Sequence, residues 1–170
     1  MRLFCALRLP DEAIDALVPW QEEHLRGRVV SPGNLHITLA FLGRRPSAEL
    51  PAICAETAAA AGGAGPIVLE PARYRETRSV GMLVLSDAGE AATALAEDLH
   101  GRLEAIGVYR REHRRWMAHL TVVRFRERPR LRPPLPPLEP FSPSDAAVYH
   151  SVLRSAGAQY EVVESFALGG

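Results

Sequence analysis

The stretch "NLHITLAFLG" at residues 34–43 places a histidine and a threonine two positions apart in an otherwise apolar run. Successive side chains of a β-strand point to opposite faces, so His36, Thr38 and Ala40 are expected on one face. The alternate residues 35, 37, 39 and 41 are all apolar and are expected to face a core. The pattern predicts a half-buried strand, ended by Gly43, whose second face is small or polar.

A second stretch, "AHLTVVRF" at residues 118–125, repeats this arrangement with His119 and Thr121. The chain has six histidines and five threonines, so about 0.2 matches to His-x-Thr are expected by chance. A single histidine of this kind is more often a structural residue with a satisfied hydrogen bond. Two such pairs, each in an apolar strand, favour a shared functional site instead.

The surroundings of the two motifs predict a duplication. A strand (2–9), a helix (11–27) that Pro19 must kink or shorten, and the first motif strand are followed later by a strand (80–87), a helix (88–107) and a strand (117–125). His36 and His119 are 83 residues apart, close to half the chain. We expect two lobes that pack around a shared cleft, so that the motif strands face each other.

The remaining segments predict further elements around this core. A second helix is expected at 47–63, an extended segment at 67–76, and two final strands at 146–154 and 160–168 that form a hairpin. The proline-rich segment 128–143 is expected to be an extended connector within the second lobe, and a partner-binding role for it is the less favoured alternative.

Two imidazoles facing one pocket are suited to acid/base catalysis, because their ordinary pKa lies near neutral pH. In-line cleavage of a phosphodiester needs one proton removed from water and one delivered to the departing oxygen. His36 and His119 are the candidates for these transfers. Thr38 and Thr121 share their faces and are candidates to hold the non-bridging phosphate oxygens.

Other reaction classes lack their signatures. The chain has no Gly-x-Ser-x-Gly elbow and no His-Glu-x-x-His spacing, so we expect neither a serine nucleophile nor a metal, and no cofactor. The apolar runs are too short to span a membrane, and residues 1–10 predict a strand rather than a signal peptide. We therefore expect a cytoplasmic protein that does not enter membranes.

Several segments together resemble a known family: "RLFCALRLP", "NLHITLAFLG", "HLTVVR" and the late "VYHSVLRSAGAQYEVVESFAL". The paired motifs are similar to those of the two-histidine (2H) phosphoesterase superfamily. Across nearly the whole chain the sequence resembles its bacterial LigT-like RNA 2′,3′-cyclic phosphodiesterases. One departure is Ala118, where the family commonly has proline.

The resemblance implies an α+β, bilobal, duplicated fold, with two mostly antiparallel sheets, outer helices and a central cleft carrying both motifs. It implies one domain over residues 1–170, expected as a monomer. It also implies hydrolysis of 2′,3′-cyclic phosphate RNA ends to 2′-phosphates, and in some members the 2′,5′ joining of tRNA halves. By motif, His36 is the acid that protonates the 3′ oxygen and His119 the base that activates water.

The resemblance also implies that Arg124 binds substrate. Five residues after His119, it points to the opposite face of a regular strand, so it reaches the phosphate only through a bulge or at the strand end. A solvated surface position is the alternative.

Further candidates for substrate contact are Arg78, which matches a family position, and Trp116 and Tyr74, as bases for stacking. All twenty basic residues are arginine, and nine lie between Arg110 and Arg132. This window either contacts RNA phosphates or is a solvated face.

Two alternatives to RNA-end hydrolysis remain from the sequence. One is a phosphoesterase that acts on a small cyclic nucleotide or a 2′,5′-linked oligonucleotide. The other is a nucleotide- or RNA-binding module without turnover.

Overall fold

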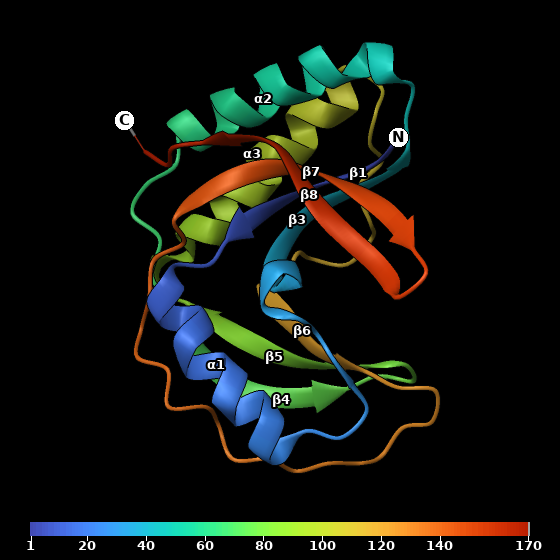
Figure 1. Ribbon diagram of the computed structural model, residues 1–170. Helices are drawn as coiled ribbons and strands as arrows, with labels where there is room; N and C mark the ends of the chain where they lie inside the picture. Colours follow the sequence, from blue (N-terminus) through green and yellow to red (C-terminus); the bar gives the residue numbers. More distant parts are fainter. Residues whose placement is uncertain (170) are drawn as a thin grey trace.

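The computed structural model describes residues 1–169, which form a bilobal α+β fold of two four-stranded antiparallel sheets and three α-helices (Figure 1). The first sheet has the strand order β3-β1-β7-β8 and the second β2-β6-β5-β4. The strands are β1 (Arg2–Arg8), β2 (Arg28–Val29), β3 (His36–Arg44), β4 (Leu69–Glu76), β5 (Val80–Asp87), β6 (His119–Arg124), β7 (Asp145–Arg154) and β8 (Gly157–Phe166). The helices are α1 (Asp11–His24), α2 (Leu50–Gly62) and α3 (Ala91–Ala105).

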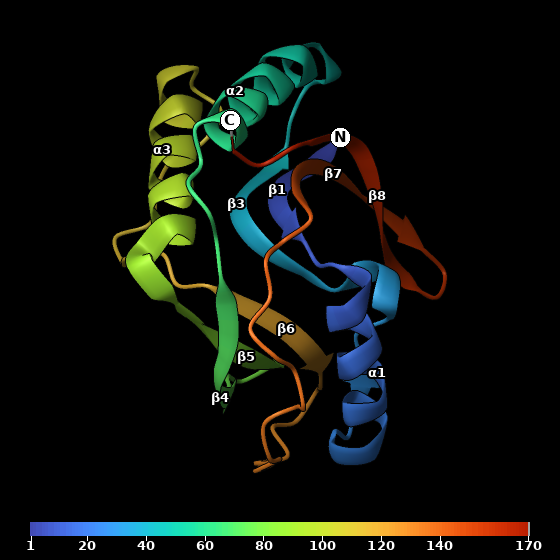
Figure 2. The same cartoon turned by 90° about the vertical axis from the view of Figure 1, so that its left-hand side faces the viewer.

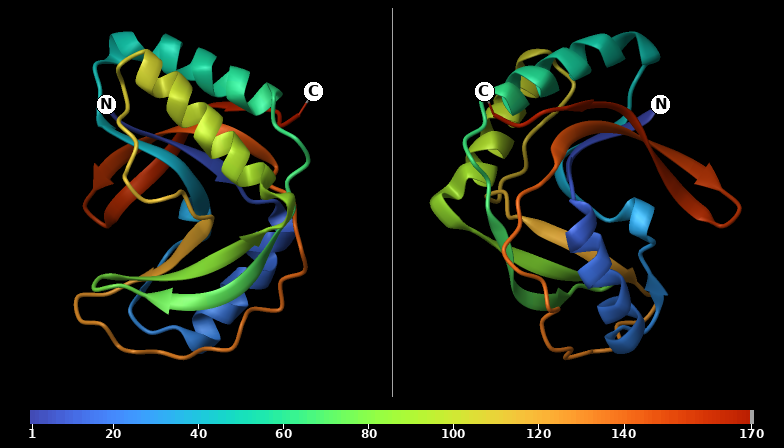
Figure 3. Two further views of the ribbon diagram at one scale, coloured as in Figure 1. Left: turned by 180° about the vertical axis from the view of Figure 1, so that it is seen from behind. Right: turned by 60° about the vertical axis from the view of Figure 1, so that its left-hand side comes forward.

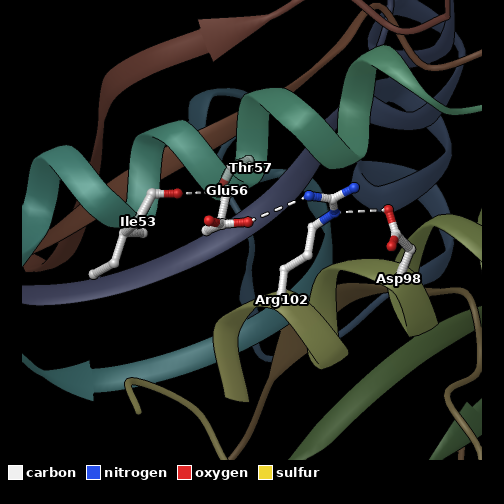
Figure 4. Close-up of polar contacts among 5 residues, drawn as sticks. All are labelled: Ile53, Glu56, Thr57, Asp98 and Arg102. Carbon is white, nitrogen blue, oxygen red and sulfur yellow. Dashed lines mark hydrogen bonds and ion pairs between the residues drawn. The ribbon is translucent and has the colours of Figure 1, made fainter. Parts of the chain in front are cut away.

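The first lobe is built on β1, a strand with an almost unbroken run of buried residues between β3 and β7. Such runs are typical of central strands covered on both faces. Helices α2 and α3 lie side by side across the face turned away from the second sheet (Figures 1 and 3). Arg102 of α3 joins them through ion pairs with Glu56 of α2 and Asp98 of its own helix (Figure 4).

The second lobe is built on β5, which pairs with β4 on one side and β6 on the other. Helix α1 lies along this sheet (Figure 2). It contains Pro19 within its 14 residues and ends at His24. Its inward face is mostly apolar but includes Gln21, which is 1% exposed.

The two lobes exchange helices. Helix α1 follows β1 of the first sheet but lies along the second, whereas α3 follows β5 of the second sheet but packs near β3 of the first (Figure 1). Most buried apolar residues of both lobes consequently belong to one core cluster, and a smaller second cluster contains Phe4, Ala6, Ala147 and Tyr149. This exchange joins the lobes into one body.

The segment 128–143 follows the second lobe, as the sequence predicts: Arg130 and Leu131 donate their backbone N–H groups to the Glu76 carboxylate of β4, and Phe141 pairs with Leu69 (Figure 1). Beyond it the chain enters β7, which pairs with β1 of the first sheet. Trp20 anchors the segment by donating its indole N–H to the Pro134 carbonyl oxygen at 2.8 Å. The predicted final hairpin is confirmed as β7 and β8. Within residues 1–169, no helix has the length and apolar character needed to cross a bilayer.

Candidate active site

A cavity of about 630 Å³ lies between the lobes and receives side chains from both motif strands. His36 and Thr38 of β3 line it from the first lobe, and Thr121 and Arg124 of β6 line it from the second. Its remaining walls include Arg2, Phe4, Arg28, Asn34, Phe41, Tyr160 and the β7–β8 turn. Three of the four motif residues therefore share one cavity with Arg124.

His36 is fixed by hydrogen bonds at both ring nitrogens. Its Nδ1 lies 2.7 Å from the Asn34 carbonyl oxygen, which only accepts, so Nδ1 carries a proton. Its Nε2 lies 3.0 Å from the Thr38 hydroxyl. In the neutral ring, Nε2 is therefore the nitrogen that accepts a proton, and Thr38 holds it in position.

Aromatic rings surround His36. Phe4 and Tyr160 have ring centroids 4.8 and 5.2 Å from the imidazole centroid, and Tyr149 lies 5.9 Å away. This burial lowers the pKa of His36 to about 4, with smaller lowering contributions from the charges of Arg124 and His119. In the free protein, His36 is consequently neutral at pH 7.

His119 is held in the same way but is not among the residues that line the cavity. Its Nδ1 lies 2.9 Å from the Met117 carbonyl oxygen, so this nitrogen also carries the proton and leaves Nε2 for exchange. The two motif strands β3 and β6 contact each other, and Thr121, on the same face as His119, lines the cavity with His36 and Thr38. The two motifs thus meet, as the sequence pattern predicts.

A β-bulge at Val122 brings Arg124 to the cavity. In the pairing of β6 with β5, Thr121 faces Met82 and Val123 faces Gly81, which leaves Val122 without a partner. A bulge adds one residue to a strand and reverses the alternation beyond it. Arg124 therefore shares a face with His119, and the geometric difficulty noted in the sequence is resolved by this bulge.

A second bulge, at Leu39, corrects the sequence prediction for β3. Thr38 pairs with Ala6 and Ala40 with Cys5, so Leu39 is left without a partner. Ala40, expected beside His36, is instead buried, whereas Phe41, expected in the core, is 51% exposed and lines the cavity. The Arg2 guanidinium lies over its ring, 5.2 Å from the centroid.

The sequence contains one signal for both bulges. Each motif strand carries two adjacent buried apolar residues, Leu39–Ala40 and Val122–Val123, where strict alternation requires one. The cavity residues Arg2, Arg28 and Tyr160 come from strands with no motif, and we find no local pattern that indicates their role.

The three further candidates for substrate contact do not line the central cavity. Trp116 donates its indole N–H to the Thr38 carbonyl oxygen at 3.0 Å, so it holds the first motif's backbone. Tyr74 packs against the core and lines a separate cavity with Arg73 and Arg75. Arg78 is exposed in the turn between β4 and β5.

The arginine-rich window is divided between several environments. Arg111, Arg114 and Arg115 form ion pairs with Glu104, Glu112 and Glu90. Arg128, Arg130 and Arg132 line the separate cavity that Tyr74 also lines. Among the nine arginines of the window, Arg124 is the one that lines the central cavity.

Comparisons with known proteins show what this chain is similar to. A family model described as "LigT like Phosphoesterase" matches residues 7–74. Two proteins named RNA 2′,3′-cyclic phosphodiesterase match shorter segments. The one from Thermus thermophilus is 52% identical over 54 residues, and the one from Escherichia coli 47% identical over 45 residues. These matches cover 30% and 25% of this chain, and 27% and 26% of the relatives' lengths.

The structural likeness extends over nearly the whole chain. The crystal structure of TT0787 from Thermus thermophilus has a TM-score of 0.84 and 31% identity, and the match covers 99% of this chain and 98% of that one. Apo LigT from Escherichia coli has a TM-score of 0.85 at 23% identity, with the same coverage, and supports the fold.

Proposed function

The chain belongs to the LigT-like family of two-histidine phosphoesterases, and from this premise we propose that it hydrolyses 2′,3′-cyclic phosphate ends of RNA to 2′-phosphates. The observation that carries the proposal is the cavity between the lobes, which is lined by His36 and Thr38 of the first motif, by Thr121 of the second motif, and by Arg124. The two relatives named above as RNA 2′,3′-cyclic phosphodiesterases support it.

In the proposed reaction, water attacks phosphorus as the bond to the 3′ oxygen breaks. One imidazole takes the proton of the attacking water, and the other delivers a proton to the departing 3′ oxygen. The two histidines lie on strands of opposite lobes, so they approach a bound phosphate from different sides. Both proton transfers are thereby assigned to residues of this chain.

Charge on the non-bridging oxygens is held by hydroxyl and guanidinium donors. Thr38, Thr121 and Arg124 all line the cavity and are the proposed donors. Arg124 is the positively charged donor among them, and its planar guanidinium can bind two phosphate oxygens at once. The Val122 bulge places Arg124 on the same face of β6 as Thr121.

The lowered pKa of His36 constrains which proton transfer this residue can perform. The family resemblance assigns the acid to His36, yet burial lowers its pKa to about 4 in the free protein. A nearby anion favours the protonated form of an imidazole. In our proposal, the bound phosphate therefore raises the pKa of His36. His36 then carries the proton that it delivers to the departing 3′ oxygen.

We further propose that residues 1–170 act as one domain of two pseudo-symmetric lobes, as a monomer in the cytoplasm. The larger core cluster, which includes residues of both lobes, supports the one-domain assignment. The substrate partners in this proposal are RNA ends, including tRNA fragments, or cyclic nucleotides.

The proposal is tested with an oligoribonucleotide that ends in a 2′,3′-cyclic phosphate, incubated with the protein in the presence of a chelator. We expect a 2′-phosphate product that resists a 3′-specific phosphatase. Faster turnover of 2′,3′-cyclic AMP than of the oligonucleotide favours the small-nucleotide alternative. Tight binding of a 2′-phosphonucleotide without hydrolysis of either substrate contradicts the enzymatic proposal.

A further inference from the structure

We propose that Gln21 and His100 are positioning residues of the active site, each holding the strand bulge that orients the cavity residues of the lobe against which its helix packs. The inference rests on the proposed function and deepens it. It assigns a role to two buried polar side chains that take no part in the proton transfers.

His100 of α3 holds the bulge of β3. Its Nε2 lies 2.7 Å from the Leu39 carbonyl oxygen, to which it donates, because a carbonyl only accepts. The His100 residue is 7% exposed. Leu39 is the unpaired residue of the bulge, and β3 is an edge strand, so no neighbouring strand lies on that side to satisfy this oxygen.

Gln21 of α1 holds the bulge of β6. Its Nε2 donates to the Val122 carbonyl oxygen at 2.9 Å and to the Val30 carbonyl oxygen at 3.1 Å. Val122 is the unpaired bulge residue, and its carbonyl oxygen also accepts from the Val30 N–H. Gln21 therefore closes the gap where the short strand β2 ends beside β6.

The two contacts are equivalent in the duplicated architecture. Leu39 and Val122 each follow their motif histidine by three residues. In each case the donor comes from the helix of the other half, because α1 and α3 are exchanged between the lobes. The equivalence by position, donor atom and acceptor atom marks the contact as a feature of the site rather than an isolated buried hydrogen bond.

Each bulge decides which face of its strand is occupied by the cavity residue two positions further along the chain. Without the bulge at Val122, Arg124 returns to the face opposite His119, and without that at Leu39, Phe41 returns to the core face. Removing His100 takes its donor from the buried Leu39 carbonyl oxygen, and removing Gln21 leaves the Val122 carbonyl oxygen with the Val30 N–H but without its side-chain donor. Either loss favours relaxation toward regular pairing. Gln21 thus acts through Arg124, and His100 through Phe41.

The test is a double-mutant cycle between Gln21→Met and Arg124→Ala, measured as kcat/KM for a 2′,3′-cyclic phosphate substrate. We expect Gln21→Met to lower kcat/KM about tenfold in the native background but less than about twofold when Arg124 is already alanine. Equal losses in both backgrounds overturn the inference.

The other half is tested by His100→Phe and His100→Gln. The phenylalanine ring lacks the N–H donor, so His100→Phe is expected to lower kcat/KM about tenfold. His100→Gln is expected to keep kcat/KM within about threefold of the native value, because a glutamine amide is the donor group that Gln21 offers to the other bulge. Equal activity of the two variants overturns the proposal, and this pair decides alone if Gln21→Met does not fold.

Thr57→Val is the matched control, because the Thr57 hydroxyl is buried and donates to the Ile53 carbonyl oxygen at 2.8 Å within α2 (Figure 4). The lost hydrogen bond lies within α2 and involves no bulge residue, although the Thr57 hydroxyl also lies 3.5 Å from Cys5 Sγ, on the strand that pairs with β3. Unchanged kcat/KM is expected, and a tenfold loss overturns the specific role. If the unmodified protein hydrolyses no substrate, the proposed function fails. The inference is then judged by NMR amide shifts, which Gln21→Met is expected to change at residues 121–124 and His100→Phe at residues 38–41.

Discussion

The indole N–H of Trp116 donates to the Thr38 carbonyl oxygen at 3.0 Å, so a side chain just before the second motif holds the backbone of the first. The bond joins segments of opposite lobes at the edge strand β3. The relative placement of the two motifs is therefore set by a direct contact as well as by the shared core.

Trp116→Phe is expected to lower both stability and activity. Loss of the hydrogen bond lowers the free energy of unfolding by about 1 kcal/mol, measured by urea denaturation, and loosens Thr38, so kcat falls several-fold. Trp20→Phe is the control, because Trp20 also donates its indole N–H to a backbone carbonyl, that of Pro134. Equal kcat losses in the two variants contradict a specific role for Trp116.

The pKa of His36 is expected to be about 4 in the free protein, against about 6.5 in the unfolded chain. The native state resists protonation, so the contribution of His36 to stability is complete above pH 6.5 and is lost as the pH falls to about 4. NMR titration of the imidazole measures this value. Saturating 2′-AMP is expected to raise it, and an unchanged pKa contradicts the proposed loading of His36 by phosphate.

Arg124→Ala is expected to lower kcat/KM by about a hundredfold, because it removes a charged donor from the cavity. Arg124→Lys is expected to recover part of the loss, since lysine keeps the charge but not the planar fork. Arg126→Ala serves as control, because Arg126 is exposed and does not line the cavity. Native kinetics of Arg124→Ala exclude the phosphate-binding role.

Gly81→Ala is expected to destabilise the protein by about 2 kcal/mol, because an added Cβ meets Val123 Cγ1 at 2.6 Å, opposite the β6 bulge. The same substitution at Gly62 meets no atom within 4 Å and is expected to be neutral or stabilising. Thermal unfolding of both variants measures the difference. Equal melting temperatures argue against close packing at the bulge.

The sequence predicted the elements well because hydrophobic periodicity and turn residues report on local structure. The strands around His36 and His119, the three helices and the final hairpin all follow from such patterns. The meeting of the two motif strands could also be predicted, because a duplicated unit places its two copies of a motif at equivalent positions in the two lobes.

The strand bulges were not predictable in the same way. Phe41 was assigned to the core because strict alternation holds only in a regular strand, and a bulge depends on tertiary donors such as Gln21 and His100. The pairing of β7 with β1 has no local signal either, because it joins strands separated by most of the chain.

The central claim is that His36 and His119 form one acid/base pair. Its most direct test is the rate of 2′,3′-cyclic phosphate opening by His36→Ala and His119→Ala, with native folding verified by circular dichroism. Each variant is expected to lose activity by at least about a thousandfold, and the double variant to lose little more, because the effects of two groups that serve one step are not additive. Full activity in either single variant contradicts the central claim.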